Sequence, residues 1–141
     1  MSTIEEIVLA YFAAWNETDE GELRALLEES WADNGLYTSP TAEAVGREAL
    51  VQRIRGFHQQ FAGHHIVCTS GVDDHHDRLR YTWAMVSPEG SRVLEGMDIG
   101  EVGSDGRMIR ITEFFGPPPP ISSSWPADLA PQNERAKDQS S

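Results

Sequence analysis

The sequence predicts an α+β domain in which helices cover one face of a curved antiparallel sheet. Apolar residues recur at helical spacing over the first half of the chain and alternate with polar ones over the second half. With 141 residues, 39% of them hydrophobic, the chain is long enough to bury one core. We therefore expect three N-terminal helices packed on a curved, mainly antiparallel sheet of four to six strands.

The first two helices follow recognisable start signals. Thr3 lies three residues before Glu6, which is a capping-box pattern, and the apolar stripe that follows predicts a helix to about Asn16. Asp19 can cap a second helix, whose apolar positions continue to Trp31. Both segments should therefore bury one face against the sheet.

After one further helix, the chain changes to strands. Gly46 precedes a third helical stripe that ends near Gly63. Beyond it, apolar and polar residues alternate, and clusters of turn-forming residues separate the runs. The expected extended segments are 36–39, 65–72, 79–85, 93–102 and 108–115.

Proline and serine set the C-terminal part of the chain apart. We expect one domain over residues 1–116 and a tail over residues 117–141 that is disordered or loosely docked. Such a segment cannot bury enough apolar area to offset the entropy lost on ordering. The four prolines at its start predict a stiff exit from the last strand, and a site for a proline-recognition domain is the alternative.

The charge balance and the cysteine content exclude several classes of protein. The net charge of −12 argues against nucleic-acid partners and against anionic membrane surfaces. The lone Cys68 excludes an intramolecular disulfide and a cysteine-based zinc site, and it is typical of a reducing compartment. No apolar run approaches the roughly 20 residues of a membrane span. We therefore expect a cytoplasmic protein without nucleic-acid or membrane partners.

Two acidic residues near the end of the predicted sheet are candidates for proton transfer. Asp98 shares a strand face with Gly96 and Gly100, which indicates either close approach of a ligand or a bend in the sheet. If residues 103–106 form a four-residue turn, Glu113 lies diagonal to Asp98 on the same face. Buried like charges at that spacing raise at least one pKa, which supplies a proton donor near neutral pH. The alternative is an exposed or arginine-paired Glu113.

Aromatic residues should shape a pocket above these carboxylates. Tyr11 lies on the buried stripe of the first helix, where its hydroxyl needs a partner. His58 follows Phe57 and can reach the pocket mouth, where a histidine could act as general base. The other histidines form adjacent pairs that chelate poorly, so we expect no metal site. The residues expected to bind the substrate are Trp15, Tyr37, Phe57, Phe61, Tyr81, Trp83, Met85 and Phe115.

Three stretches carry a resemblance to a known family. They are IVLAYFAAWNETD, YTSPTAEAVGREAL and GMDIGEVGSDGRMIRITEFFG. Over about residues 4–116 the chain resembles the SnoaL-like and ketosteroid-isomerase-like branch of the nuclear transport factor 2 superfamily. The resemblance implies a cone-shaped α+β fold with a deep pocket and a homodimer formed through the outer face of the sheet.

The resemblance also suggests roles for individual residues. Ketosteroid isomerases use a tyrosine and a protonated aspartic acid as an oxyanion hole, and a second aspartate as base. By resemblance, Tyr11 occupies the position of that tyrosine and Asp98 that of the protonated acid. The base normally precedes a proline, but Ser39 stands before Pro40, and its hydroxyl has too high a pKa to act unaided. This departure argues against steroid isomerisation.

Together these observations favour an enzyme that moves protons without a cofactor. It would be an isomerase, cyclase or dehydratase that binds a small apolar or aromatic carbonyl compound. Asp98 would be the acid or base, Tyr11 the donor to a developing enolate, and Glu113 or His58 the second proton carrier. One alternative is a non-catalytic small-ligand binder or regulatory dimer, which Ser39 favours. The other is a protein-interaction module that uses the outer sheet face and the tail.

Overall fold

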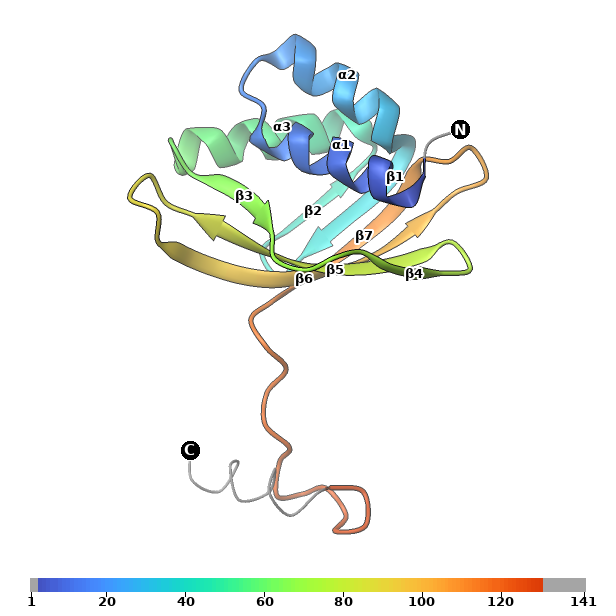
Figure 1. The fold of residues 1–141 in the computed structure, drawn as a ribbon, viewed down its shortest axis with the longest axis vertical. Helices are drawn as coiled ribbons and strands as arrows, with labels where there is room; N and C mark the ends of the chain where they lie inside the picture. The colour runs from blue at the N-terminus through green and yellow to red at the C-terminus, as the bar shows by residue number, and fades with distance from the viewer. Residues whose placement is uncertain (1–2, 131–141) are drawn as a thin grey trace.

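The computed structural model describes residues 3–130 and has the expected α+β architecture. Three helices cover one face of a curved sheet, as Figure 1 shows. The helices are α1 (Ile4–Asn16), α2 (Glu20–Ser30) and α3 (Arg47–Gln60). The strands are β1 (Trp31–Ser39), β2 (Ala42–Val45), β3 (His65–Cys68), β4 (Asp73–His75), β5 (Arg78–Val86), β6 (Arg92–Val102) and β7 (Met108–Phe115).

The sheet is mixed, although most of its strand pairs are antiparallel. Its order is β2-β1-β7-β6-β5-β3, and β4 pairs with the start of β5. The pair β1–β7 is parallel, and every other pair is antiparallel. The seven strands exceed the expected four to six because β2 and β4 are too short to show an alternating pattern in the sequence.

Local signals start the helices where the sequence predicts. The Thr3 hydroxyl accepts a hydrogen bond from the backbone N–H of Glu6 at 3.1 Å, and the Asp19 carboxylate accepts one from that of Glu22 at 3.0 Å. Each cap satisfies a backbone donor that has no partner inside the helix. Helix α3 follows Gly46, whose φ of +91° is a conformation that glycine adopts without strain.

The predicted end of the second helix is wrong. Helix α2 ends at Ser30, and Trp31 begins β1, where it pairs with Met108 of β7. The Trp31 side chain is fully buried, and its ring stacks on Tyr11 at a centroid distance of 5.7 Å. Long-range pairing and burial thus override the helical pattern that precedes this residue.

A bulge sets the register between β6 and β7. A four-residue turn would place Asp98 opposite Ile111, and this expectation is wrong. The loop is one residue longer, because the backbone N–H of Gly103 donates to the carbonyl of Arg107 at 2.8 Å, and a register shift follows in the ladder. Asp98 therefore lies directly opposite Glu113 rather than diagonal to it.

Beyond β7 the chain leaves the sheet on the side away from the helices (Figure 1). Residues 117–130 form no helix or strand, and the side chains of Trp125 and Leu129 are 49% and 64% exposed. Residues 131–141 of the expected tail lie outside the described residues, so the domain boundary at residue 116 stays a prediction. Within residues 3–130, no helix has both the length and the apolarity that crossing a bilayer requires.

Candidate functional site

A cavity of about 60 Å³ lies between helices α1 and α3 and the inner face of the sheet. A buried water needs roughly 10–15 Å³ of such space, so the cavity accommodates a small organic group. Six of the expected substrate-binding residues line it: Trp15, Tyr37, Phe57, Trp83, Met85 and Phe115. The lining also includes Tyr11, Asp98 and Glu113, together with Phe12, Arg53, Ile66 and Leu94, which we did not predict.

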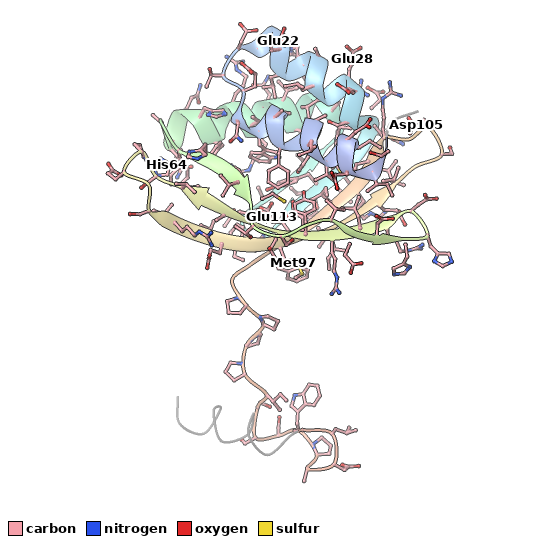
Figure 2. The ribbon with its side chains drawn as sticks, in the orientation of Figure 1. Glu22, Glu28, His64, Met97, Asp105 and Glu113 are labelled. Carbon is pink, nitrogen blue, oxygen red and sulfur yellow. The ribbon has the colours of Figure 1, made fainter. Side chains whose placement is uncertain are left out.

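The polar side of this cavity is a row of side chains that crosses neighbouring strands. Tyr81 of β5 pairs with Asp98 of β6, and Asp98 pairs with Glu113 of β7. Tyr37 on β1 completes the row. In Figure 2, Glu113 lies on the helix side of the sheet and Met97 on the opposite side. The alternation of side chains along a strand thus places both carboxyl groups on the face of the sheet that lines the cavity.

Hydrogen bonds hold the two carboxyl groups in place. Asp98, which is only 3% exposed, accepts from the Tyr81 hydroxyl at 2.6 Å and from the Trp83 indole N–H at 2.9 Å. Glu113 accepts from the Tyr37 hydroxyl at 2.9 Å. The two acids are also directly opposed across β6 and β7, and both line the cavity. Because two buried carboxylates at opposed positions repel each other, the pair favours a state in which one of the two acids is protonated.

The environment places this proton on Glu113. Burial, followed by the charge of Asp98, raises the pKa of Glu113 to about 9. Burial also raises the pKa of Asp98, but the hydrogen bonds from Tyr81 and Trp83 oppose that rise by stabilising the carboxylate. We therefore assign a protonated Glu113 and an ionised Asp98 at neutral pH. This assignment differs from the one that the resemblance to ketosteroid isomerases implied.

The glycines beside Asp98 make room for neighbouring side chains. A Cβ atom on Gly96 would lie 2.6 Å from the carbonyl oxygen of Phe114 and would overlap the Trp83 indole. A Cβ on Gly100 would lie 3.0 Å from the Leu79 side chain. The space beside Asp98 is therefore filled by protein side chains, and Gly96 allows the indole to reach the carboxylate.

Tyr11 lines the same cavity, and its hydroxyl is an unused donor among the described residues. Tyr11 is 2% exposed, and its hydroxyl has no hydrogen-bond partner among the described residues. Burial, and then the charge of Asp98, raise the pKa of Tyr11 well above its ordinary value, so the phenol is neutral. Since buried hydroxyls are normally hydrogen-bonded, this donor is available to a ligand.

Three residues that we predicted at the site do not line the cavity. His58 is not among the lining residues, and its Nε2 lies 2.8 Å from the backbone oxygen of Trp15. The expectation that His58 reaches the mouth is therefore not met. Phe61 lies just past the end of α3, with its ring 6.0 Å from that of Phe57. Tyr81 packs below the cavity as the donor to the aspartate.

Ser39 and Cys68, which the sequence analysis discussed, lie outside the set of lining residues. Ser39 ends β1, and its hydroxyl lies 3.5 Å from that of Thr41. The Cys68 residue is exposed, but partial desolvation of its sulfur raises the pKa of the thiol. Among residues 3–130, no three His, Cys, Asp or Glu side chains are arranged to hold a metal ion.

Arg53 is the most informative lining residue that the sequence reasoning missed. It lies on α3, three residues after Leu50 and four before Phe57, and both of these residues are buried. Residues at these spacings share one helix face. An arginine on an otherwise apolar, core-facing stripe was therefore the signal that could have identified it.

Comparison with known proteins identifies the family of this chain. The model of the SnoaL-like domain matches residues 8–111. A proposed isomerase of the SnoaL-like family from Agrobacterium tumefaciens is 30% identical, with a TM-score of 0.76 over 79% of this chain and 96% of that one. No curated protein matches at a significant level.

Two more distant structures agree in fold. A proposed polyketide cyclase from Sinorhizobium meliloti is 19% identical, with a TM-score of 0.62 over 77% of this chain and 93% of that one. An NTF2-like protein of unknown function from Cytophaga hutchinsonii is 12% identical, with a TM-score of 0.63 over 83% of this chain and 93% of that one. At these identities the likeness concerns the fold alone, and it bears out the expected cone-shaped architecture.

Proposed function

The chain belongs to the SnoaL-like family, and from this premise we propose that it is a cofactor-free acid/base enzyme acting on a small, largely apolar carbonyl compound. One observation carries the proposal: two directly opposed, buried carboxyl groups line the same cavity as Tyr11, whose hydroxyl has no partner among the described residues. The relative from Agrobacterium, described as an isomerase, supports this reaction class.

Each group has a distinct task in the proposed reaction. The Tyr11 hydroxyl donates a hydrogen bond to the substrate carbonyl oxygen. The ionised carboxylate of the Asp98–Glu113 pair removes a proton from the carbon beside that carbonyl. The electron pair of the C–H bond forms a C=C bond, and the carbonyl π electrons move to the oxygen. The resulting enolate is stabilised by Tyr11, and apolar walls keep water from protonating it.

The fate of this enolate distinguishes three reactions. Return of the proton to a different carbon gives an isomer. Attack of the enolate carbon on a second carbonyl of the same molecule, whose oxygen takes up the proton, gives a cyclic aldol. Loss of a β-hydroxyl group, which leaves as water with the Glu113 proton, gives a dehydrated product. All three begin with the same proton abstraction.

That common first step can be tested without knowing the substrate. We would incubate ketosteroids and polyketide-like 1,3-diketones in D₂O and follow loss of the α-proton signal by NMR. The wild type should accelerate exchange, and Glu113→Gln or Asp98→Asn should reduce the acceleration roughly 100-fold or more. Glu95→Gln, which changes an exposed carboxylate, is the matched control. Exchange that both site variants leave unchanged would falsify the proposal.

A non-catalytic ligand-binding protein is the second candidate. Two observations favour it: Ser39 stands where the related isomerases have their base, and both Asp98 oxygens already accept hydrogen bonds. A carboxylate with two strong donors is a weaker base than a free one. If carbonyl compounds bind and stabilise the wild type but their α-protons exchange at the background rate, this second function holds.

We further propose that the protein is a cytoplasmic homodimer formed through the outer face of the sheet. Val93, Ile99 and Phe114 lie on that face with 52%, 45% and 55% of their surface exposed. Large apolar side chains gathered on one face are typical of an interface. Light scattering after size exclusion should give twice the chain mass for the wild type and the monomer mass for Phe114→Glu.

A further inference from the structure

Arg53 is a charged side chain on the cavity wall that lacks a partner among the described residues. Most arginines in residues 3–130 are ion-paired with a carboxylate: Arg24, Arg47, Arg55, Arg78, Arg80, Arg92 and Arg107. Of the two remaining in that range, Arg110 is exposed to water. Arg53 is partly buried, and neither an ion pair nor a hydrogen bond to a described residue holds it.

The buried part of Arg53 is the part that recognises planar anions. Its Nε–H is inaccessible to solvent and has no acceptor among the described residues. In a guanidinium, Nε–H and one Nη–H point in parallel and form the edge that binds a carboxylate through two hydrogen bonds. A buried donor without an acceptor is rare in folded proteins, and a movement of the Arg53 side chain toward the cavity would let a ligand supply the missing acceptor.

The charges around the cavity favour a ligand with a single negative charge. Arg53 is the only Lys, Arg or His among the described lining residues. It lies close enough to Glu113 and Tyr37 to stabilise negative charge on both. The Asp98–Glu113 pair contributes one negative charge and the chain has a net charge of −12, so a ligand with more than one negative charge would be repelled.

We propose that the ligand of this cavity carries a carboxylate that the Arg53 guanidinium binds through its Nε edge. This inference rests on the proposed function in taking the cavity as the substrate site, and it narrows the substrate class to small oxo acids with an apolar body. The carboxylate lies at the Arg53 end of the cavity. The carbonyl oxygen lies at the Tyr11 hydroxyl, so two fixed points orient the substrate above the carboxyl pair.

Matched probes test this inference by binding, without turnover. We would titrate ¹⁵N-labelled full-length protein at pH 7 with pyruvate, butyrate and benzoate, and with the primary amide of each. Amide and arginine Nε–H signals in two-dimensional NMR report weak binding. At least one carboxylate should bind ten-fold or more tightly than its amide and should shift the Arg53 Nε–H signal. Arg53→Gln should abolish the preference, and Arg53→Lys should keep part of it.

The controls separate this inference from the proposed function. Arg110→Gln, which removes the exposed unpaired arginine, should leave the preference unchanged. Equal binding of acid and amide, failure of every carboxylate to bind, or a preference that persists in Arg53→Gln overturns the inference. Glu113→Gln should still bind the carboxylate, because it keeps Arg53. Carboxylate binding without α-proton exchange would therefore contradict the proposed enzymatic function and support the carboxylate site at Arg53. Exchange with neutral ketones, without carboxylate binding, would support the enzymatic function and contradict the carboxylate site.

Discussion

Asp98 and Glu113 lie directly opposite each other on β6 and β7, and both line the same cavity. Like charges at directly opposed positions of a sheet normally destabilise it. A proton held on Glu113 removes this repulsion, and donors from Tyr81, Trp83 and Tyr37 satisfy the remaining carboxyl oxygens. The pair therefore behaves as one monoanionic unit, and its chemistry depends on keeping a single proton.

This protonation state predicts how stability depends on pH. Glu113 has a folded-state pKa of about 9 against an ordinary value of 4.5, so the folded state binds its proton more tightly than the unfolded state. The stabilisation is complete below about pH 4.5 and is lost as pH rises toward 9. Glu113→Gln mimics the protonated acid and lacks this dependence.

Urea denaturation of the wild type and of Glu113→Gln at pH 5, 7 and 9 measures the effect. The free energy of unfolding of the wild type should fall relative to that of the variant as pH rises. Subtracting one from the other removes the contribution of carboxylates such as Glu48 and Asp105, whose lowered pKa values act in the opposite direction. A difference that stays constant with pH would contradict the assigned proton.

The rate of any exchange reaction should depend on the protonation states of Glu113 and Asp98. Any exchange reaction should be lost as pH rises through about 9, because ionisation of Glu113 removes the acid and places two charges side by side. On the acid side, activity should be lost when Asp98 becomes protonated. Because burial raises the pKa of Asp98, this loss should occur at a higher pH than the ordinary pKa of an aspartate. The pH dependence of kcat/KM between pH 4 and 10 tests both limbs. A flat profile would exclude the pair as proton carrier.

Two tyrosines should respond oppositely to loss of their hydroxyls. Tyr11→Phe removes an unpartnered buried hydroxyl, so the free energy of unfolding should stay the same or rise, while catalysis falls. Tyr81→Phe leaves one oxygen of the buried Asp98 without its donor and should destabilise the protein by about 1–3 kcal/mol. Denaturation and exchange assays on both variants check this. A destabilised Tyr11→Phe protein would mean that the hydroxyl has a partner inside the fold.

Local patterns predicted much of this fold. The Thr3 and Asp19 caps depend on neighbours three residues away, and strand alternation correctly placed Asp98 and Glu113 on one face. The prediction failed where distant segments meet. Pairing of Trp31 with β7 depends on Met108, and the hydrogen bond from Tyr37 to Glu113 spans 76 residues.

The candidate site was predictable to a similar extent. Its aromatic lining follows from the apolar stripes, because those residues must face the core. One extra loop residue and a separate bulge together bring Asp98 opposite Glu113, and hydropathy encodes neither of them. Arg53 shares a stripe with buried residues, but its lack of a partner is a property of the folded chain alone.

The contact between Gly96 and Trp83 supplies the last prediction. An added Cβ at Gly96 would meet the Phe114 carbonyl at 2.6 Å and overlap the indole that donates to Asp98. Backbone cannot yield there without disturbing the β6–β7 ladder, so the indole must move. Gly96→Ala should therefore destabilise the protein by about 1–3 kcal/mol.

The matched control is Gly56→Ala in α3, where an added Cβ meets nothing within 4 Å. It should stabilise the protein by about 0.5–1 kcal/mol, because alanine is the better helix former. Urea denaturation of both variants gives the comparison, and tryptophan fluorescence reports displacement of Trp83. If Gly96→Ala were as stable as the wild type and kept its exchange activity, the indole would not be needed to hold Asp98. In that case the Tyr81 hydroxyl would suffice as the protein donor that keeps the carboxylate ionised.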